Sequence, residues 1–211
     1  MQVKVYQESN AETLASLLTK VRACTACSDA LPLGPRPILQ LSASATILVA
    51  SQAPGSKVHQ SGVPFSDASG ERLREWMGLS SEEFYDESTV AIVPMGFCYP
   101  GRLNGGDAPP RMECVHLWRN QLLQLLSSVR LTLLVGSYAQ QHVLGSGAIT
   151  PRVKNFCDYL PEYFPLPHPS WRSRIWEEKN PWFAQDVLPA LRSAIKLARA
   201  GDQQRNSARS N

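Results

Sequence analysis

The sequence predicts an α/β fold of three layers, α/β/α, in which helices cover both faces of a central, mostly parallel sheet of about four strands. Three short apolar runs, 45–50, 89–93 and 131–135, are typical of strands that are buried on both faces. A weaker fourth run covers 163–166. Helical patterns separate the runs, and strands that alternate with helices join by right-handed crossovers into a parallel sheet.

The helices are predicted from the spacing of apolar residues and from the residues that cap helix ends. The first covers 10–21, where apolar residues recur at helical spacing and Ser9 or Asn10 is expected to be the cap. We expect it to end at Cys24. The other predicted helices cover 111–126, 136–144 and 180–198.

Length and composition favour one folded domain. The chain has 211 residues, of which 43% are hydrophobic and 18% charged, which is enough apolar material for a core. We expect a single domain over 1–200 and a disordered tail over 201–211, because the tail has no apolar periodicity. No apolar run approaches the length of a membrane span and no secretory signal is recognisable, so we expect a cytoplasmic protein, taken as a monomer. The net charge of +3 permits a nucleic-acid partner without requiring one.

Four of the five cysteines form two pairs. Cys24 and Cys27 make a C-x2-C pair, and Cys98 and Cys114 a wider C-x15-C pair whose intervening loop is rich in glycine and proline. Four thiolates from two distant segments can hold a tetrahedral zinc ion or a [4Fe-4S] cluster, and the ligand count does not separate the two. The alternative is that the four are small buried thiols. Cys157 fits neither pair.

Ligand-binding loops are expected where the strands end. In open parallel sheets, ligands bind beyond the carboxyl ends of the strands, which here are followed by 51–70, 95–110 and 167–174. The first of these loops offers an aromatic face at Phe65. The third holds His168 between two prolines, where a ring is better placed to reach a ligand than to pack in a core.

These loops resemble the motifs of the uracil-DNA glycosylase superfamily. Residues 51–55 with 61–70 resemble its first motif, and 168–170, which read His-Pro-Ser, resemble its second. The cysteine spacing is similar to that of the iron-sulfur branch called family 4, in which four cysteines bind a [4Fe-4S] cluster. The resemblance extends over about 20–195. It implies an enzyme that takes a damaged base out of the DNA stack and cleaves its N-glycosidic bond.

The resemblance implies roles for individual residues. Phe65 corresponds to the aromatic residue that stacks on the extruded uracil, and His168 to the histidine that hydrogen-bonds the base. Ala53, Gly55 and Ser170 belong to the two motifs and are expected to contact the substrate. The resemblance also assigns the cluster to Cys24, Cys27, Cys98 and Cys114.

The first motif departs from the family pattern. Gln52 stands where family 4 has a glutamate, and Ala53 where the classical uracil enzymes have their water-activating aspartate. Pro94 replaces an asparagine that reads uracil in family 4. We therefore consider Gln52 itself as a catalytic candidate, with Asp67 and His59 as substitutes for the missing carboxylate. Asp67 also suits a helix cap.

Other residues have two interpretations each. Phe65 also suits ordinary core packing, and His168 a bond to local backbone. Trp171 lies where the family has its minor-groove wedge, and it could equally pack on Trp176. Basic residues in or beside the loops are expected to contact phosphate, or else to form a solvated surface: Lys57, Arg72, Arg74, Arg102, Arg111, Arg172 and Arg174.

Three functions are open at this point. The first is a DNA glycosylase that removes uracil or another damaged base, with a structural [4Fe-4S] cluster. The second is a non-catalytic protein of the same fold that binds damaged or single-stranded DNA. The third is a zinc-stabilised domain without a nucleic-acid role, which would leave the loop motifs unexplained.

Overall fold

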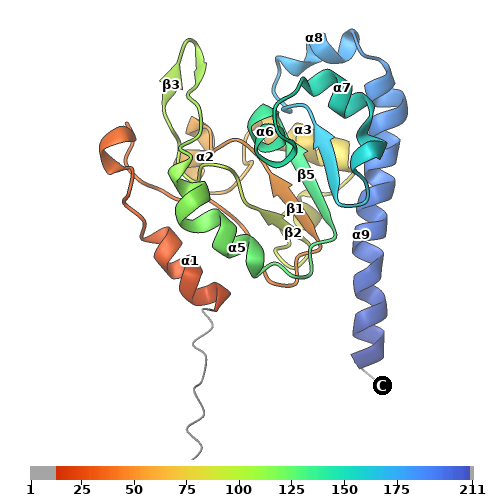
Figure 1. The fold of residues 1–211 in the computed structure, drawn as a ribbon, viewed down its shortest axis with the longest axis horizontal. Helices are drawn as coiled ribbons and strands as arrows, with labels where there is room; N and C mark the ends of the chain where they lie inside the picture. Colours follow the sequence, from red (N-terminus) through yellow and green to blue (C-terminus); the bar gives the residue numbers. More distant parts are fainter. Residues whose placement is uncertain (1–12, 210–211) are drawn as a thin grey trace, which may run out of the picture.

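The central sheet has the predicted parallel arrangement. The structure is a computed structural model that describes residues 13–209. Its main sheet holds β1 (Ile47–Ala50), β2 (Val90–Ile92), β5 (Leu131–Val135) and β6 (Tyr163–Leu166), in the order β2-β1-β5-β6. Every neighbouring pair is parallel, which confirms the three-layer α/β fold class (Figure 1).

The remaining elements connect and cover these strands. One helix, α9, is long, and two helical segments contain π-helical turns, at η2 and η4. The elements are α1 (Leu14–Arg22), η1 (Ser28–Ala30), α2 (Ser56–Ser61), α3 (Ala68–Met77), α4 (Ser81–Tyr85), β3 (Arg102–Leu103), β4 (Gly106–Asp107), η2 (Val115–Arg119), α5 (Asn120–Gln124), α6 (Ser137–Leu144), α7 (Ile149–Lys154), η3 (Phe156–Tyr159), α8 (Ser173–Glu178), η4 (Phe183–Val187) and α9 (Leu188–Arg209).

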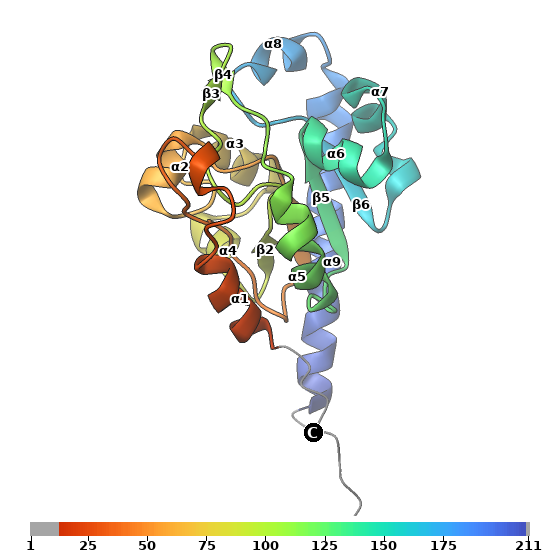
Figure 2. The same ribbon diagram turned by 60° about the vertical axis from the view of Figure 1, so that its left-hand side comes forward.

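Helices bury both faces of the sheet, because successive side chains of a strand point to opposite faces. Ile47 and Val49 of β1 belong to a core that includes α3, α4 and α9. Leu48, between them, belongs to a second core with α1 and α5. The strands are apolar throughout because both of their faces are buried, as the sequence predicts. Figure 2 shows α1 and α5 on one side of the sheet and α9 on the other.

The ends of the first and last helices differ from expectation. The cap of α1 is Thr13, whose hydroxyl accepts a hydrogen bond from Ser16 N–H at 3.2 Å. The predicted caps, Ser9 and Asn10, lie outside the described residues. The last helix continues to Arg209, where the sequence predicts a disordered tail from residue 201. No helix within 13–209 is long and apolar enough to cross a membrane.

A β-hairpin forms in the loop that joins Cys98 to Cys114. It joins β3 to β4 through Asn104 and Gly105, which have φ of +50° and +77°. Positive φ at both central residues is the tight hairpin turn that Asn-Gly favours. Figures 1 and 2 both show this hairpin above the carboxyl ends of the sheet strands, on the same side of the molecule as α8.

Candidate active site

Two cavities adjoin each other at the carboxyl edge of the sheet. The first, which we call the inner pocket, has a volume of about 80 Å³ and is enclosed largely by apolar side chains. The second, the outer groove, has a volume of about 650 Å³ and runs between the β3–β4 hairpin and the segment before α8. Four residues line both cavities and define what we call the junction: Ala53, Ser69, Asp107 and His168.

Phe65 forms a rigid wall of the inner pocket. Only 9% of its surface is exposed, and its ring packs edge-on against Phe84 at a centroid distance of 6.1 Å. Its φ is +53°, a conformation that is rare for a large side chain and is typical of functional sites. The carbonyl of Phe65 accepts hydrogen bonds from Arg74 Nη1 and from the Tyr85 hydroxyl, at 3.2 and 3.1 Å. Phe65 therefore packs in the core and also lines the inner pocket, while its stacking on a base stays a prediction.

Gly70 permits this conformation of Phe65. A Cβ atom at Gly70 would lie 1.7 Å from the Phe65 carbonyl oxygen. We expect Gly70→Ala to lower the free energy of unfolding by about 1–3 kcal/mol, because backbone must move to admit the methyl group. Thermal unfolding would measure this. Gly106→Ala is the control, since its Cβ would meet the flexible end of Arg172 at 3.3 Å and the Leu103 carbonyl oxygen at an ordinary contact distance of 4.0 Å. Equal melting temperatures for Gly70→Ala and the wild type would contradict the prediction.

His168 reaches the junction from the loop after β6, as predicted from its motif. Its ring lies over Gly136, where a Cβ atom would be 3.5 Å from the His168 ring. Its carbonyl accepts a hydrogen bond from the Ser173 hydroxyl at the start of α8. Burial lowers the pKa of His168, while the negative charges of Asp67 and Asp107 act in the opposite direction. The imidazole is thus set toward its neutral form, in which one ring nitrogen donates and the other accepts.

Asp67 lines the inner pocket and also caps α3. Its Oδ1 accepts a hydrogen bond from Gly70 N–H at 3.1 Å. The helix-cap interpretation of Asp67 is therefore confirmed. One carboxylate oxygen is committed to the backbone, which leaves Asp67 less free to act on a ligand.

The first-motif residues lie at the cavities, and Gln52 has a structural partner. Ala53 lines both cavities and Gly55 the inner pocket. Gln52 lines the outer groove, and its Nε2 donates a hydrogen bond to the carbonyl of Ala108 at 3.2 Å. Gln52 therefore fastens the loop after β1 to the chain that leaves the hairpin.

Sequence reasoning missed Asp107. This residue lies on β4 and lines both cavities, and its Oδ2 is only 3.4 Å from where a Cβ atom at Gly55 would be. Partial burial raises the pKa of Asp107, and the positive charges of Arg102 and His168 oppose that rise. The Asn-Gly turn three residues earlier is a hairpin signal that could have drawn attention to it.

Two other residues considered at the sequence level have clear positions. Pro94 lines the inner pocket. His59 is buried on α2, with its ring 6.1 Å from the ring of Tyr99, and it lines neither cavity. His59 is therefore not brought to the junction.

The outer groove is basic, but only some of the predicted cations line it. Lys57, Arg102 and Arg172 do so. Arg172 Nη2 also donates to the Gly105 carbonyl at 2.9 Å, which links the hairpin to the segment before α8. Arg174 lines a neighbouring groove.

Three other predicted phosphate contacts, which do not line the outer groove, are engaged within the protein. Arg72 pairs with Glu177 at 2.6 Å, and Arg74 binds the Phe65 carbonyl. Arg111 pairs with Glu113 and lines the cysteine cavity. These three arginines serve structural contacts.

Trp171 projects from the surface beside the outer groove. It is 72% exposed and carries the Arg172 guanidinium over its ring at 5.5 Å. The alternative of packing on Trp176 is wrong, because Trp176 packs instead on Trp182 and Phe183. Ser170, the last residue of the second motif, also lines the outer groove.

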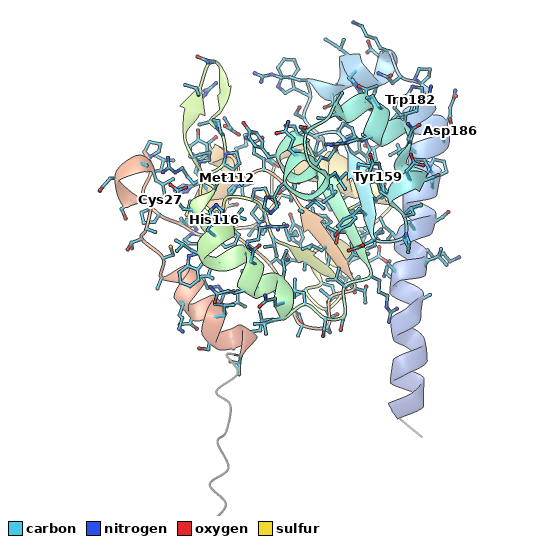
Figure 3. All side chains as sticks on the ribbon, viewed as in Figure 1. Cys27, Met112, His116, Tyr159, Trp182 and Asp186 are labelled. Carbon is cyan, nitrogen blue, oxygen red and sulfur yellow. The ribbon has the colours of Figure 1, made fainter. Side chains whose placement is uncertain are left out.

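The two cysteine pairs face one cavity. Cys24, Cys27, Cys98 and Cys114 all line it, together with apolar residues. Figure 3 labels Cys27 after α1 and Met112 two residues before Cys114, which marks the two segments that meet here. Each sulfur has an N–H group near it: Trp118 Nε1 donates to Cys24 at 3.2 Å and Phe97 N to Cys114 at 3.4 Å, the backbone N–H of Arg36 faces Cys98, and the Arg111 side chain faces Cys27.

The surroundings of this cavity are unfavourable for free thiolates. Burial raises the pKa of Cys114 to about 11, so a cation is needed to keep that sulfur deprotonated at neutral pH. Among residues 13–209, no group of three or more His, Cys, Asp or Glu side chains that could hold a metal ion is found. The metal site stays a prediction. Cys157 is exposed on η3, away from this cavity.

Comparison with protein families gives one match over most of the chain. The model described as uracil DNA glycosylase superfamily matches residues 40–192. The matched range includes all four strands of the main sheet and every residue of the junction.

Proposed function

The chain belongs to the uracil DNA glycosylase superfamily, and from this premise we propose that it is a DNA glycosylase that hydrolyses the N-glycosidic bond of uracil or another damaged base. The observation that carries the proposal is the junction, where a narrow pocket meets a wide basic groove. A flipped nucleotide has a planar base on one side of its glycosidic bond and the charged backbone on the other. The two cavities match these two halves.

The inner pocket suits a base. Phe65 offers a ring for stacking, and apolar side chains such as Ile38 and Val58 surround the space beside it. Enzymes that act on a base take it out of the stack and hold it in a pocket of this kind. Pro94 contributes no polar side chain, so selection among bases falls to the junction and to pocket shape.

His168 is placed to assist departure of the base. When the glycosidic bond breaks, negative charge develops on the leaving base. A neutral imidazole N–H at the junction can donate a hydrogen bond to the base oxygen and stabilise that charge. In this proposal His168 is the donor for the leaving group.

We further propose that Cys24, Cys27, Cys98 and Cys114 hold a [4Fe-4S] cluster, with zinc as the alternative. Four thiols at one apolar cavity and an N–H donor beside each sulfur fit a thiolate-bound group. When bound, the group would link the two chain segments that carry the cysteines. These cysteines would tie the segment after α1 to the loop that carries the hairpin.

The direct test is base release from defined oligonucleotides. Purified protein is incubated with single- and double-stranded DNA that carries one uracil or one other modified base, and abasic sites are revealed by alkali. Strand breaks at the modified position support the proposal. Absence of breaks on the whole panel contradicts it.

A second candidate function is a non-catalytic binder of damaged or single-stranded DNA. Gln52 and Ala53 favour it, since neither supplies the first-motif carboxylate. The same oligonucleotides separate the two candidates. Tight binding of modified DNA without base release would favour the binder.

DNA affinity is expected to fall steeply with salt. Lys57 and Arg102 line the outer groove and are exposed, so the double variant Lys57→Ala, Arg102→Ala should lose about two phosphate contacts. The slope of log affinity against log salt should then flatten by about 1.8 for duplex DNA. Fluorescence anisotropy at several salt concentrations measures this slope. Lys154→Ala is the control, because its exposed side chain on α7 lines neither cavity. An unchanged slope in the double variant would contradict phosphate binding in this groove.

A further inference from the structure

Residues 51–55, which directly follow β1, contain no carboxylate, although a carboxylate on the sugar side of the bond would assist base release. Positive charge develops on the sugar as the base leaves, and a carboxylate stabilises it or accepts a proton from the attacking water. Gln52 and Ala53 occupy the expected positions and have no acidic group. The cavities do contain two carboxylates, Asp67 and Asp107.

These two carboxylates differ in the cavities that they line and in their hydrogen bonds to the protein. Asp67 lines the inner pocket but not the outer groove, and one of its oxygens accepts a hydrogen bond from the Gly70 N–H as a helix cap. Asp107 lines both cavities, so it lies where a glycosidic bond would cross from one to the other. Its Oδ2 would lie 3.4 Å from a Cβ atom at Gly55, in the segment 51–55 that contains no carboxylate.

Gln52 holds the chain beside Asp107 in place. Its side-chain amide donates to the carbonyl of Ala108, the residue that follows Asp107. A carboxylate at position 52 could not donate this hydrogen bond and would repel Asp107. An amide at position 52 can therefore lie beside the Asp107 carboxylate without repulsion, whereas a second carboxylate there would repel it.

We propose that Asp107 is the catalytic carboxylate of this protein, supplied by the hairpin of the cysteine loop, and that Gln52 is its positioning residue. The inference rests on the glycosylase function proposed above. It places His168 on the base side of the bond and Asp107 on the sugar side.

The reaction that follows is a balanced hydrolysis. The bond between C1′ and the base nitrogen breaks, and its electron pair goes to the base, which His168 stabilises. Water forms a bond to the positive C1′ and loses a proton to the Asp107 carboxylate. The Asp107 carboxyl then releases that proton to solvent and the base takes up one proton, so the products are an abasic site and the free base.

The kinetic test compares three aspartate variants under single-turnover conditions. On a substrate that the wild type cleaves, Asp107→Asn should slow base release by about 100-fold or more, the usual effect of losing a positioned acid-base group. Asp67→Asn should slow it far less, since asparagine can also cap a helix. Asp158→Asn, exposed on η3, is the remote control. A wild-type rate in Asp107→Asn would overturn the inference.

A binding test separates the inference from the proposed function. DNA with a protonated pyrrolidine in place of the target nucleotide imitates the positive sugar, and DNA with tetrahydrofuran imitates its neutral form. The wild type should prefer the cationic analogue by about tenfold, as expected for a site complementary to the transition state. Asp107→Asn should lose this preference.

The same measurement tests the positioning role of Gln52. Gln52→Met removes the donor at similar size, and it should weaken the preference for the cationic analogue while affinity for the neutral one stays constant. If the wild type releases no base, the proposed function fails, and the preference still tests Asp107 alone. Equal binding of both analogues by wild type and Asp107→Asn overturns the inference.

Discussion

Replacing His168 with alanine is expected to slow base release by about two to three orders of magnitude, the usual effect of losing one transition-state donor. DNA affinity should change little, because the backbone contacts lie in the outer groove. The fold should persist, since His168 stands in a loop and lines both cavities. An effect on the rate without an effect on affinity marks an interaction made in the transition state.

Single-turnover rates and anisotropy titrations on the same oligonucleotide measure both quantities. His116→Ala is the matched control, because His116 is exposed on η2 and lines neither cavity. Full activity of His168→Ala on every substrate that the wild type cleaves would show that the assigned site is wrong.

Replacing Cys24 with alanine is expected to remove the bound cluster and most of the soluble protein together. The cysteine cavity brings together the segment after α1 and the loop after β2. Because binding of a thiolate-bound metal group contributes directly to folding, loss of one ligand should destabilise the fold. The anaerobically purified wild type should be brown, absorb near ~400 nm and contain about four irons per chain.

Iron and sulfide analysis with solubility measurements on wild type and variant tests this expectation. Cys157→Ala is the control and should keep its colour and solubility, since Cys157 lies on η3 away from the cavity. Stoichiometric zinc without iron would leave a metal site and reject the cluster. A soluble, unchanged Cys24→Ala protein would reject both.

The strands and the motif residues could be predicted from local sequence. A strand such as 131–135 is apolar throughout because helices cover both faces of the sheet, and that pattern is readable without a structure. Phe65 and His168 stand in loops that follow strands, so topology alone brings them to one edge of the sheet.

Other features depend on contacts between distant segments and were not predictable in this way. Asp107 reaches the junction only because the hairpin folds over the first-motif loop, and the bond from Gln52 to Ala108 spans 56 residues. The partners of Arg72 and Arg74 likewise come from tertiary packing. The π-helical turns at η2 and η4 leave no signal in the apolar spacing that predicted the helices.

The unusual backbone of Phe65 has a consequence for the entropy of binding. Two hydrogen bonds and the close approach of Gly70 fix its backbone carbonyl, and its ring packs edge-on against Phe84. The conformational freedom of this aromatic wall is therefore lost when the protein folds, before any ligand arrives. A planar group that enters the inner pocket meets a surface that needs no further ordering, and preorganisation of this kind favours recognition by shape over recognition by rearrangement.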